Sequence, residues 1–279
     1  MIKIITPDNS HILALRRLWK EAFGDSDTFL DAFFSTAYHA NRCRCICKDD
    51  LPVAVLYWFD CLYDNHSIAY IYAVATAKSY QHQGLCHKLL ADTHVHLKES
   101  GYAGALLVPG NEALFKLYEG MGYKTTCYIH KFTCTAKHSV FPADSVPPVD
   151  TVVPVDSVLP ATVNTSLRRI DKKEYRHLRR HFLPEKGVIQ ENENLDFLET
   201  QMDFYTGNNL LFTACKKNDI LHVAELLGNT ESAKEILQAL GCRKGFFKTP
   251  GTDSPFAMYY PLNNKKLTPP SYFGLAFDE

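Results

Sequence analysis

The alternation of apolar and polar positions in the first part of the chain predicts a strand, two helices and then a run of strands. Residues 1–6 alternate apolar and polar side chains, which is typical of a strand with one buried face. Apolar residues then recur at three- and four-residue spacing over 12–23 and over 29–37, which predicts two amphipathic helices, the second capped by residues 25–27. Apolar and β-branched segments between 43 and 76, separated by turn residues, predict a meander of antiparallel strands.

The pattern changes from strand to helix within residues 70–90. Residues 70–76 read Tyr-Ile-Tyr-Ala-Val-Ala-Thr and predict a buried strand, whereas apolar residues from Leu85 onward follow helical spacing. In the loop between them, Gly84 removes side-chain bulk beside the first N–H groups of the helix, which have no intrahelical partners. Because these amides and the helix dipole point the same way, the turn predicts an anion site and a ligand that bears phosphate.

A second strand and helix follow in the same order. Residues 103–108 predict another buried strand, which is parallel to the first because a helix intervenes. Residues 111–121 then carry apolar side chains on one helical face, and Gly120 and Gly122 end this helix. The antiparallel meander therefore runs into a parallel pair, which indicates a mixed sheet.

Two motifs in these segments resemble those of the GCN5-related N-acetyltransferase (GNAT) family. The loop 81–86 is similar to the family's pyrophosphate loop, Gln/Arg-x-x-Gly-x-Gly/Ala, with Gln81 and Gly84 in place and Cys86 where the family has Gly or Ala. The segment 111–123 resembles the family's Asn-x6-Tyr-x3-Gly-Phe/Tyr, and its matching positions are Asn111, Tyr118, Gly122 and Tyr123. The two motifs also stand in the family's order, so that their combination is far more specific than either motif alone.

The resemblance implies the GNAT fold, an α/β (α+β) arrangement with a mixed central sheet flanked by helices. It also implies an acyl-CoA-dependent N-acyltransferase, in which acetyl-CoA is the acyl donor and a primary amine of a small-molecule or peptide acceptor attacks the thioester directly. Tyr118 is then the general acid that protonates the leaving thiolate. The residues expected to bind the coenzyme are Val74, Thr76, Gln81, His82, Gln83, Gly84, Leu85, Cys86, His87 and Asn111.

These residues have different expected roles. Main-chain atoms of Val74 and Thr76 pair with the pantetheine arm, and the amide near Val74 polarises the thioester carbonyl. The N–H groups of residues 83–87 hold the pyrophosphate, with His82 and His87 as neighbours of the phosphates. Asn111 fixes the start of its helix and contacts the coenzyme arm.

The general base is left open by the sequence. Some members of the family carry a glutamate early on the central strand, but residues 68–72 of this chain include no carboxylate. The alternatives are a water relay, an acceptor that arrives partly neutral, or a base elsewhere, for which Asp60, His66 and Glu21 are the candidates considered.

Two other functions remain open at this point. In one alternative, the protein is a non-catalytic acyl-CoA-binding or sensing module. Cys86 in the loop and the missing carboxylate on the central strand are consistent with that function. In the other alternative, the protein is a tandem-GNAT aminoacyl transferase acting on peptidoglycan precursors. The helical arm and basic surfaces typical of those transferases are not apparent in this sequence.

The second half has a similar order of elements but lacks the loop motif. Residues 1–134 are expected to form the GNAT domain, a proline-rich segment over 135–166 a linker, and residues 167–279 a degenerate GNAT-like domain. In the last of these the pattern predicts helices at 172–181, 194–204 and 231–240, a hairpin over 210–227, and strands at 245–249 and 256–261. Without an amide cradle, this half is expected to cover the first domain and shape the acceptor cleft rather than bind coenzyme. The strand that closes the first sheet is expected from the linker or from the second half.

Composition adds limits rather than a function. With 279 residues, 46% apolar and 22% charged residues and a formal net charge of −1, the chain gives no indication of binding to nucleic acid or to an anionic membrane. No bilayer-spanning run or signal peptide is apparent, and nine cysteines without a Cys-x-x-Cys pair indicate reduced thiols and a cytoplasmic protein. No metal site is expected, because the cysteines at 43, 45 and 47 share one strand face and the histidines lack partners at ligand spacing. The acceptor and the oligomeric state are not determined by the sequence.

Overall fold

The computed structural model describes residues 2–136, 167–263 and 267–277, so most of the predicted linker lies outside the described residues. The first half contains β1 (Ile2–Ile5), α1 (Ile12–Phe23), α2 (Asp27–Thr36), β2 (Cys43–Lys48), β3 (Leu51–Tyr63), β4 (His66–Thr76), α3 (Leu85–Glu99), β5 (Gly104–Leu107), α4 (Glu112–Glu119) and β6 (Lys124–Thr135). The second half contains β7 (Arg168–Ile170), α5 (Lys172–Phe182), β8 (Ile189–Gln190), α6 (Glu193–Glu199), β9 (Asp203–Gly207), β10 (Leu210–Lys217), β11 (Ile220–Gly228), α7 (Ala233–Ala239), β12 (Lys244–Pro250) and β13 (Ser254–Pro261).

Local sequence signals explain where the first helices begin and end. Gly24 ends α1 with φ +76°, a left-handed conformation that glycine adopts without a Cβ clash. Ser26 begins α2, and its hydroxyl accepts a hydrogen bond from the Phe29 amide at 3.1 Å. Asp25, two residues before the helix, is therefore not needed as its cap.

One predicted helix is too long. The helix expected over 194–204 ends at Glu199, and its last residues belong to β9. In β9 Phe204 and Thr206 are buried while Asp203, Tyr205 and Gly207 are partly exposed, which is the alternation of a strand. Pairing with β10 thus overrides the helical spacing at this point.

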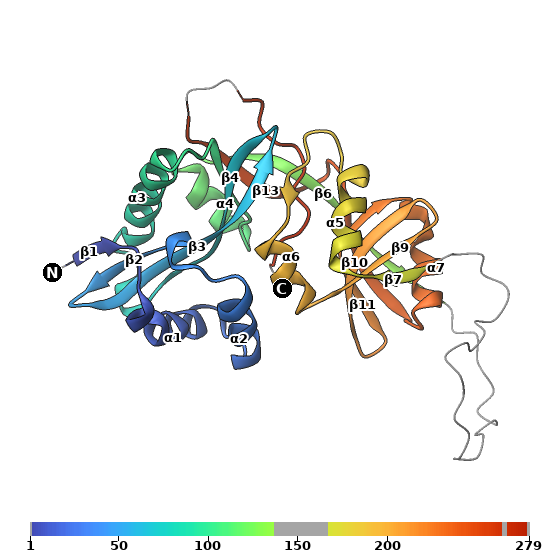
Figure 1. The fold of residues 1–279 in the computed structure, drawn as a ribbon, viewed down its shortest axis with the longest axis horizontal. Coiled ribbons are helices and arrows are strands. Elements are labelled where there is room, and N and C mark those ends of the chain that lie inside the picture. Colours follow the sequence, from blue (N-terminus) through green and yellow to red (C-terminus); the bar gives the residue numbers. More distant parts are fainter. Residues whose placement is uncertain (1, 137–166, 264–266, 278–279) are drawn as a thin grey trace, which may run out of the picture.

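The described strands form one mixed 13-stranded sheet in the order β1-β2-β3-β4-β5-β13-β6-β12-β11-β10-β9-β7, with β8 beside β3. Each half contributes one parallel pair, β4 with β5 and β11 with β12. The arrangement of strands is the same from either edge of the sheet. In each half an antiparallel meander leads to a parallel pair, and the two central strands, β13 and β6, lie between these pairs. Figure 1 shows the two halves side by side, with β6 passing from one to the other.

The two central strands are exchanged between the halves. β13, from the end of the chain, lies between β5 and β6 and pairs antiparallel with both. The distal part of β6 pairs with β12 of the second half. The strand that closes the first sheet therefore comes from the second half, one of the two sources expected from the sequence. Because the sheet is continuous, the division into domains at 1–134 and 167–279 stays a prediction.

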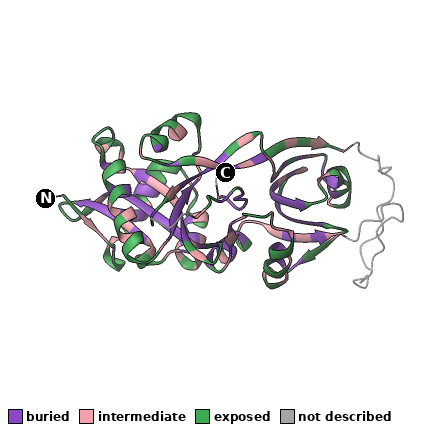
Figure 2. Cartoon of the chain, turned by 90° about the horizontal axis from the view of Figure 1, so that it is seen from above, coloured by how far each residue is buried: buried purple, intermediate pink, exposed green. Residues whose placement is uncertain are grey.

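Helices cover the first half of the sheet on both faces. Along β3, Tyr57 and Phe59 pack with α1 and α2 in one apolar cluster, whereas Leu56 and Trp58 pack with α3 and α4 in another. This separation follows from the period of two along a strand. A third cluster lies between β10, β11 and α7. Figure 2 shows the buried residues concentrated along the strands in the middle of both halves.

A buried ion pair joins the second half to the C-terminal segment. Glu225, which is fully buried on β11, accepts hydrogen bonds from Arg179 Nε at 2.7 Å and from the Tyr175 hydroxyl at 3.0 Å. The hydroxyl of Tyr272 donates to the same carboxylate at 3.0 Å. These hydrogen bonds fix α5 and the segment that follows β13 relative to β11.

We expect Glu225→Gln to lower the free energy of unfolding by about 3 kcal/mol, because it leaves the Arg179 charge buried without its counter-ion. Urea unfolding followed by circular dichroism measures the change. Glu174→Gln is the matched control: Glu174 is paired with Arg168 at the surface, and its loss should leave the unfolding midpoint nearly unchanged. Equal shifts in both variants would contradict a special role for the buried pair.

Candidate functional site

The parallel strands β4 and β5 separate after a short region of pairing. Residues 68–71 pair with residues 104–107, and β5 then ends at Leu107 while β4 continues to Thr76. In the same part of β4 the register with β3 shifts, so that Ala75 pairs with Val55 and Tyr72 pairs with Tyr57. Ala73 and Val74 form the resulting bulge, and Ala73 has φ +48°. The main chain of β4 is therefore irregular at the place where the strands separate.

A cavity of about 320 Å³ occupies the opening between β4 and β5. Val74, predicted to contact the coenzyme, and Tyr118, the predicted general acid, both line this cavity. Its other walls are mostly apolar and aromatic, and they include Trp19, Phe23, Phe29, Tyr72, Leu107, Leu114 and Phe277. The structure thus brings together two predicted residues that are far apart in the sequence.

The start of α3 has the features expected of an anion site. Gly84 precedes the helix with φ +72°, and the position where a Cβ would stand is open space. No side chain caps this end, and the first bond back into the turn runs from the Lys88 amide to the Gly84 carbonyl at 3.0 Å. The amides of Leu85, Cys86 and His87 accordingly have no intrahelical acceptor. The first turn holds no acidic side chain that would repel an anion.

The loop before α3 is shaped by its own side chains. The Gln81 side chain donates to the Thr76 carbonyl at 3.2 Å, and the Gln83 side chain donates to the Ser79 carbonyl at 3.3 Å. His82 has φ +60°, a conformation that is uncommon for a residue with a side chain. These interactions hold the backbone of the loop close to the end of β4, so that Thr76 and Gly84 belong to one local structure.

The two motif residues of α4 are placed differently. Asn111 caps the helix, because its side-chain oxygen accepts a hydrogen bond from the Leu114 amide at 3.0 Å. Tyr118 is only 6% exposed and contacts Tyr123 edge to face. Burial, and then the neighbouring Cys86, raises the pKa of the Tyr118 phenol above its ordinary value, so that it stays protonated at neutral pH. Burial also raises the pKa of the Cys86 thiol to about 11, which keeps the thiol uncharged there.

None of the base candidates considered from the sequence lines the cavity. Glu21 accepts a hydrogen bond from the Lys78 amide at 2.7 Å. Asp60 is held by Arg42 and by the hydroxyl of Tyr102. His66 contacts the main-chain oxygen of Asp64 at 2.6 Å, in the turn between β3 and β4.

Asp25 is a residue that the sequence reasoning did not single out. Among the described residues it is the one carboxylate in the lining of the cavity, where it accepts a hydrogen bond from the Trp19 indole at 2.7 Å. In the sequence, residues 25–27 predict only a helix cap. Because Ser26 alone supplies that cap, Asp25 is available for another role. Phe277, which also lines the cavity, gave no signal at all, because it arrives from the far end of the chain.

The cysteines and helices add two further observations. No group of three or more potential metal ligands occurs within the described parts of the chain. Cys43, Cys45 and Cys47 are buried on one strand, where the sulfur atoms of Cys45 and Cys47 lie 3.7 Å apart. Among the helices described, none has the length and apolar character required to cross a bilayer.

The chain shares the fold of several solved acetyltransferase structures. A GCN5-related N-acetyltransferase from Kribbella flavida is 13% identical and superposes with a TM-score of 0.66, covering 94% of this chain and 71% of its own. A GCN5-related N-acetyltransferase from Anabaena variabilis is 15% identical and superposes with a TM-score of 0.65, covering 94% of this chain and 73% of its own. A tandem GNAT protein from the clavulanic acid biosynthesis pathway is 9% identical and superposes with a TM-score of 0.57, covering 95% of this chain and 100% of its own.

The likeness to these structures extends over both halves and shows a common fold. A comparison with curated protein sequences finds no matching relative. The family model described as acetyltransferase (GNAT) domain matches residues 3–126, a range that contains β4, the loop before α3 and Tyr118. Residues 3–126 of this chain therefore match the acetyltransferase (GNAT) domain, and both halves share the fold of these GCN5-related N-acetyltransferase structures.

Proposed function

We propose that the protein transfers the acetyl group of acetyl-CoA to a primary amine by direct attack of the amine on the thioester. The observation that carries this proposal is a single cavity, between the separated ends of β4 and β5, that is lined by both Val74 and Tyr118. The uncapped start of α3 lies next along the chain, where the family binds pyrophosphate. Acetyl-CoA, when bound, supplies an activated acyl group as a thioester.

The residues present fit such a coenzyme. The open space at Gly84 lets an anion approach the amides of Leu85, Cys86 and His87, and the helix dipole favours negative charge there. The bulge at Ala73 and Val74 removes main-chain groups from the regular ladder with β3 and makes them candidates for bonding to the pantetheine arm. Gln81 and Gln83 keep the loop in shape through their bonds to main-chain oxygens.

Tyr118 acts as the general acid in this proposal. A phenol with a raised pKa holds its proton throughout the neutral range and can donate it to the departing thiolate. Asp25 attracts the ammonium form of the acceptor into the cavity and is the candidate to receive its proton, directly or through water. The aromatic side chains around both groups exclude bulk water, which strengthens the electrostatic interactions inside the cavity.

The second half is proposed to be a degenerate GNAT-like domain that binds no coenzyme. In the turn after β11, a Cβ added at Gly228 would stand 2.3 Å from the main-chain oxygen of Asn209. The space beside Gly228 is therefore filled by the Asn209 main chain, whereas the corresponding space beside Gly84 is open. The nine cysteines are free thiols, which supports a cytoplasmic location for the enzyme.

A non-catalytic acyl-CoA sensor is the second candidate. Cys86 stands where the family has Gly or Ala, and β4 carries no carboxylate facing the opening. A sensor would bind the coenzyme with the same residues but would show no turnover with any amine. The Tyr118 variant below separates the two functions, because only an enzyme has turnover to lose.

Gly84→Glu is expected to weaken acetyl-CoA binding by at least about tenfold, or 1.4 kcal/mol, because it places a negative side chain where the phosphates are held. Calorimetric titration measures the affinity. Gly101→Glu is the matched control, since Gly101 also has positive φ and open space at its Cβ position but lies beyond the other end of α3. Unchanged binding in Gly84→Glu would contradict the phosphate site.

Tyr118→Phe is expected to lower kcat by about a hundredfold or more, with little change in acetyl-CoA affinity, because only the proton donor is lost. Because the pKa of the phenol is raised, wild-type kcat should show no loss from Tyr118 ionisation up to about pH 10, the ordinary value for tyrosine. Tyr123→Phe removes a hydroxyl that contacts His94 instead, and is the control. A normal kcat in Tyr118→Phe would rule out the general-acid role.

Asp25→Asn is expected to raise the KM for the amine by about tenfold, as charge-assisted hydrogen bonds of this kind contribute about 1.5–3 kcal/mol. The affinity for acetyl-CoA should stay as in the wild type. Asp27→Asn, in the first turn of α2 and paired with Lys20 at the surface, is the control. Identical kinetics for the two variants would show that Asp25 does not bind the acceptor.

A further inference from the structure

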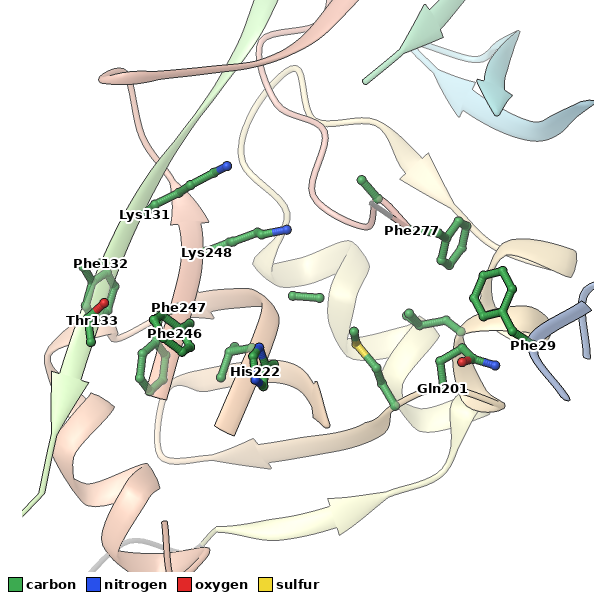
Figure 3. Close-up of a pocket in the computed structure, with 15 residues that line it drawn as sticks. Phe29, Lys131, Phe132, Thr133, Gln201, His222, Phe246, Phe247, Lys248 and Phe277 are labelled. Carbon is green, nitrogen blue, oxygen red and sulfur yellow. The ribbon is translucent and has the colours of Figure 1, made fainter. Parts of the chain in front are cut away.

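A second cavity, with a volume of about 480 Å³, lies in the other half, where β11 and β12 separate (Figure 3). These strands pair in parallel over residues 220–223 and 244–247, as β4 and β5 do in the first half. The pairing of β11 with β10 shifts register and leaves Ala224 in a bulge, and Ala224 lines the cavity. The second cavity therefore has the same position in its half as the cavity between β4 and β5 (the first cavity) has in the other.

The turn after β11 offers no open space beside its glycine for a phosphate. A Cβ added at Gly228 would stand against the main chain of Asn209 and the ring of Phe182. The segment that follows is a single turn of 3₁₀ helix at Thr230–Ser232 and then the short helix α7. The second cavity is therefore suited to a ligand of a different kind from the coenzyme.

The walls of the second cavity are mostly apolar. Figure 3 shows Phe132, Phe246 and Phe247 on one side of it, and Phe29 and Phe277 on the other. Further apolar surface comes from smaller side chains in the lining, which are those of Leu198, Met202, Val223, Ala224 and Ala276. Each methylene group that passes from water onto such surface strengthens binding by about fourfold.

Most polar side chains of this lining already have partners in the chain. The Gln201 side chain donates a hydrogen bond to the hydroxyl of the preceding residue at 2.8 Å, and His222 and Lys248 each interact with another residue. Lys131 and Thr133, the remaining two, lie on β6 and are exposed to solvent. None of the described lining residues is a carboxylate. An ammonium group in this cavity would therefore lose its hydration without gaining a counter-ion, whereas an uncharged apolar group would not.

The two cavities adjoin at two aromatic side chains. Phe29 from α2 and Phe277 from the C-terminal segment line both of them. Each contacts the ring of Phe197, at 5.3 Å and 5.0 Å between ring centres. Asp25 lines the first cavity and not the second. A molecule that extends from Asp25 past Phe29 and Phe277 would therefore leave the carboxylate behind and meet apolar walls.

We propose that the acceptor is an amine with a long, uncharged apolar body, and that the second cavity binds this body. The ammonium group lies beside Asp25 in the first cavity, and the chain passes Phe29 and Phe277 into the second. For the identity of the ligand as acceptor, this inference rests on the proposed acetyl transfer. The binding of an apolar molecule to the second cavity does not depend on that activity.

The first experiment measures binding without turnover. N-phenyl-1-naphthylamine, an uncharged fluorophore that brightens in apolar surroundings, is titrated into the full-length protein. Phe246→Asp places a negative charge in the lining of the second cavity and should weaken binding by at least about tenfold. Leu117→Asp is the matched control, because Leu117 lines neither cavity and is 44% exposed, close to the 39% of Phe246.

Two further variants fix the location of the bound fluorophore. Phe23 is also exposed but lines the first cavity only, so Phe23→Asp should leave the affinity unchanged. Met202 lines the second cavity only, in the loop after α6, and Met202→Asp should repeat the effect of Phe246→Asp. Circular dichroism verifies that each variant is folded.

The second experiment tests whether the bound apolar body belongs to the acceptor. Acetyl transfer is measured with n-alkylamines of increasing length and with α,ω-diamines of the same lengths. For the alkylamines kcat/KM should rise by about fourfold per methylene until the chain fills the second cavity. A diamine that reaches this cavity should be at least about tenfold poorer than the alkylamine of its length, because its second ammonium group meets apolar walls.

Phe246→Asp provides a specific change in this series. Its new carboxylate should reverse the preference for long chains, so that the diamine becomes the better acceptor. Short alkylamines, which occupy the first cavity only, should keep the kcat/KM of the wild type. A variant that was merely less stable would lower kcat/KM for all chain lengths alike.

The outcomes separate the two proposals. A kcat/KM that is independent of chain length, or a preference for long alkylamines that Phe246→Asp does not change, would overturn the inference and leave the transferase intact. Fluorophore binding at the second cavity of a protein that acetylates no amine would overturn the proposed function, and with it the role of this cavity in binding an acceptor, but would retain the apolar site. Absent fluorophore binding, or binding that is lost in Phe23→Asp rather than in Phe246→Asp, would overturn the second site itself.

Discussion

The exchange of two strands between the halves is the constraint on which the rest of the structure depends. β5 is only four residues long, and it is held on one edge by β4 and on the other by β13 from the end of the chain. Because β13 satisfies the far edge of β5, the near edge is free to separate from β4 after Leu107 without leaving a second unpaired strand. The opening between β4 and β5 in the first half is thus stabilised by residues of the second half. The same argument holds in reverse for β12, which is held by β6.

The buried Glu225 network extends this dependence to the wall of the site. The Tyr272 hydroxyl donates a hydrogen bond to Glu225, and the Tyr272 main-chain oxygen accepts one from the Val188 amide, so that the C-terminal segment is anchored before it reaches the first half. From that anchor Phe273 contacts Tyr70, and the Phe277 main-chain oxygen accepts a hydrogen bond from Tyr72 at 3.3 Å. A carboxylate buried in the second half therefore helps to position an aromatic side chain in the wall of the cavity between β4 and β5.

The sequence predicted what depends on local chemistry and missed what depends on distant pairing. The open turn at Gly84, the cap at Asn111 and the ends of α1 arise from a few neighbouring residues, and each has a composition signal. The position of β13 depends on two strands more than a hundred residues away, so that its own alternation shows that it is a strand but not which sheet it completes. Asp203 and Phe204 show the opposite error: the helix predicted over 194–204 includes them, whereas pairing with β10 places them in a strand. Asp25 was named only as part of a cap, because direction into a cavity is a property of packing rather than of spacing.

The two openings in the sheet use the same backbone geometry with different turns beside them. In the first, the start of α3 leaves main-chain amides without intrahelical acceptors next to an open glycine turn, an arrangement that favours anions. In the second, the position of the turn at Gly228 is filled by the Asn209 main chain and the ring of Phe182. An amide cradle requires the whole turn to be rebuilt, whereas the parallel strand pair beside it is present in both halves. A fold with two related openings can therefore keep its strand geometry in both while the open turn is present at one.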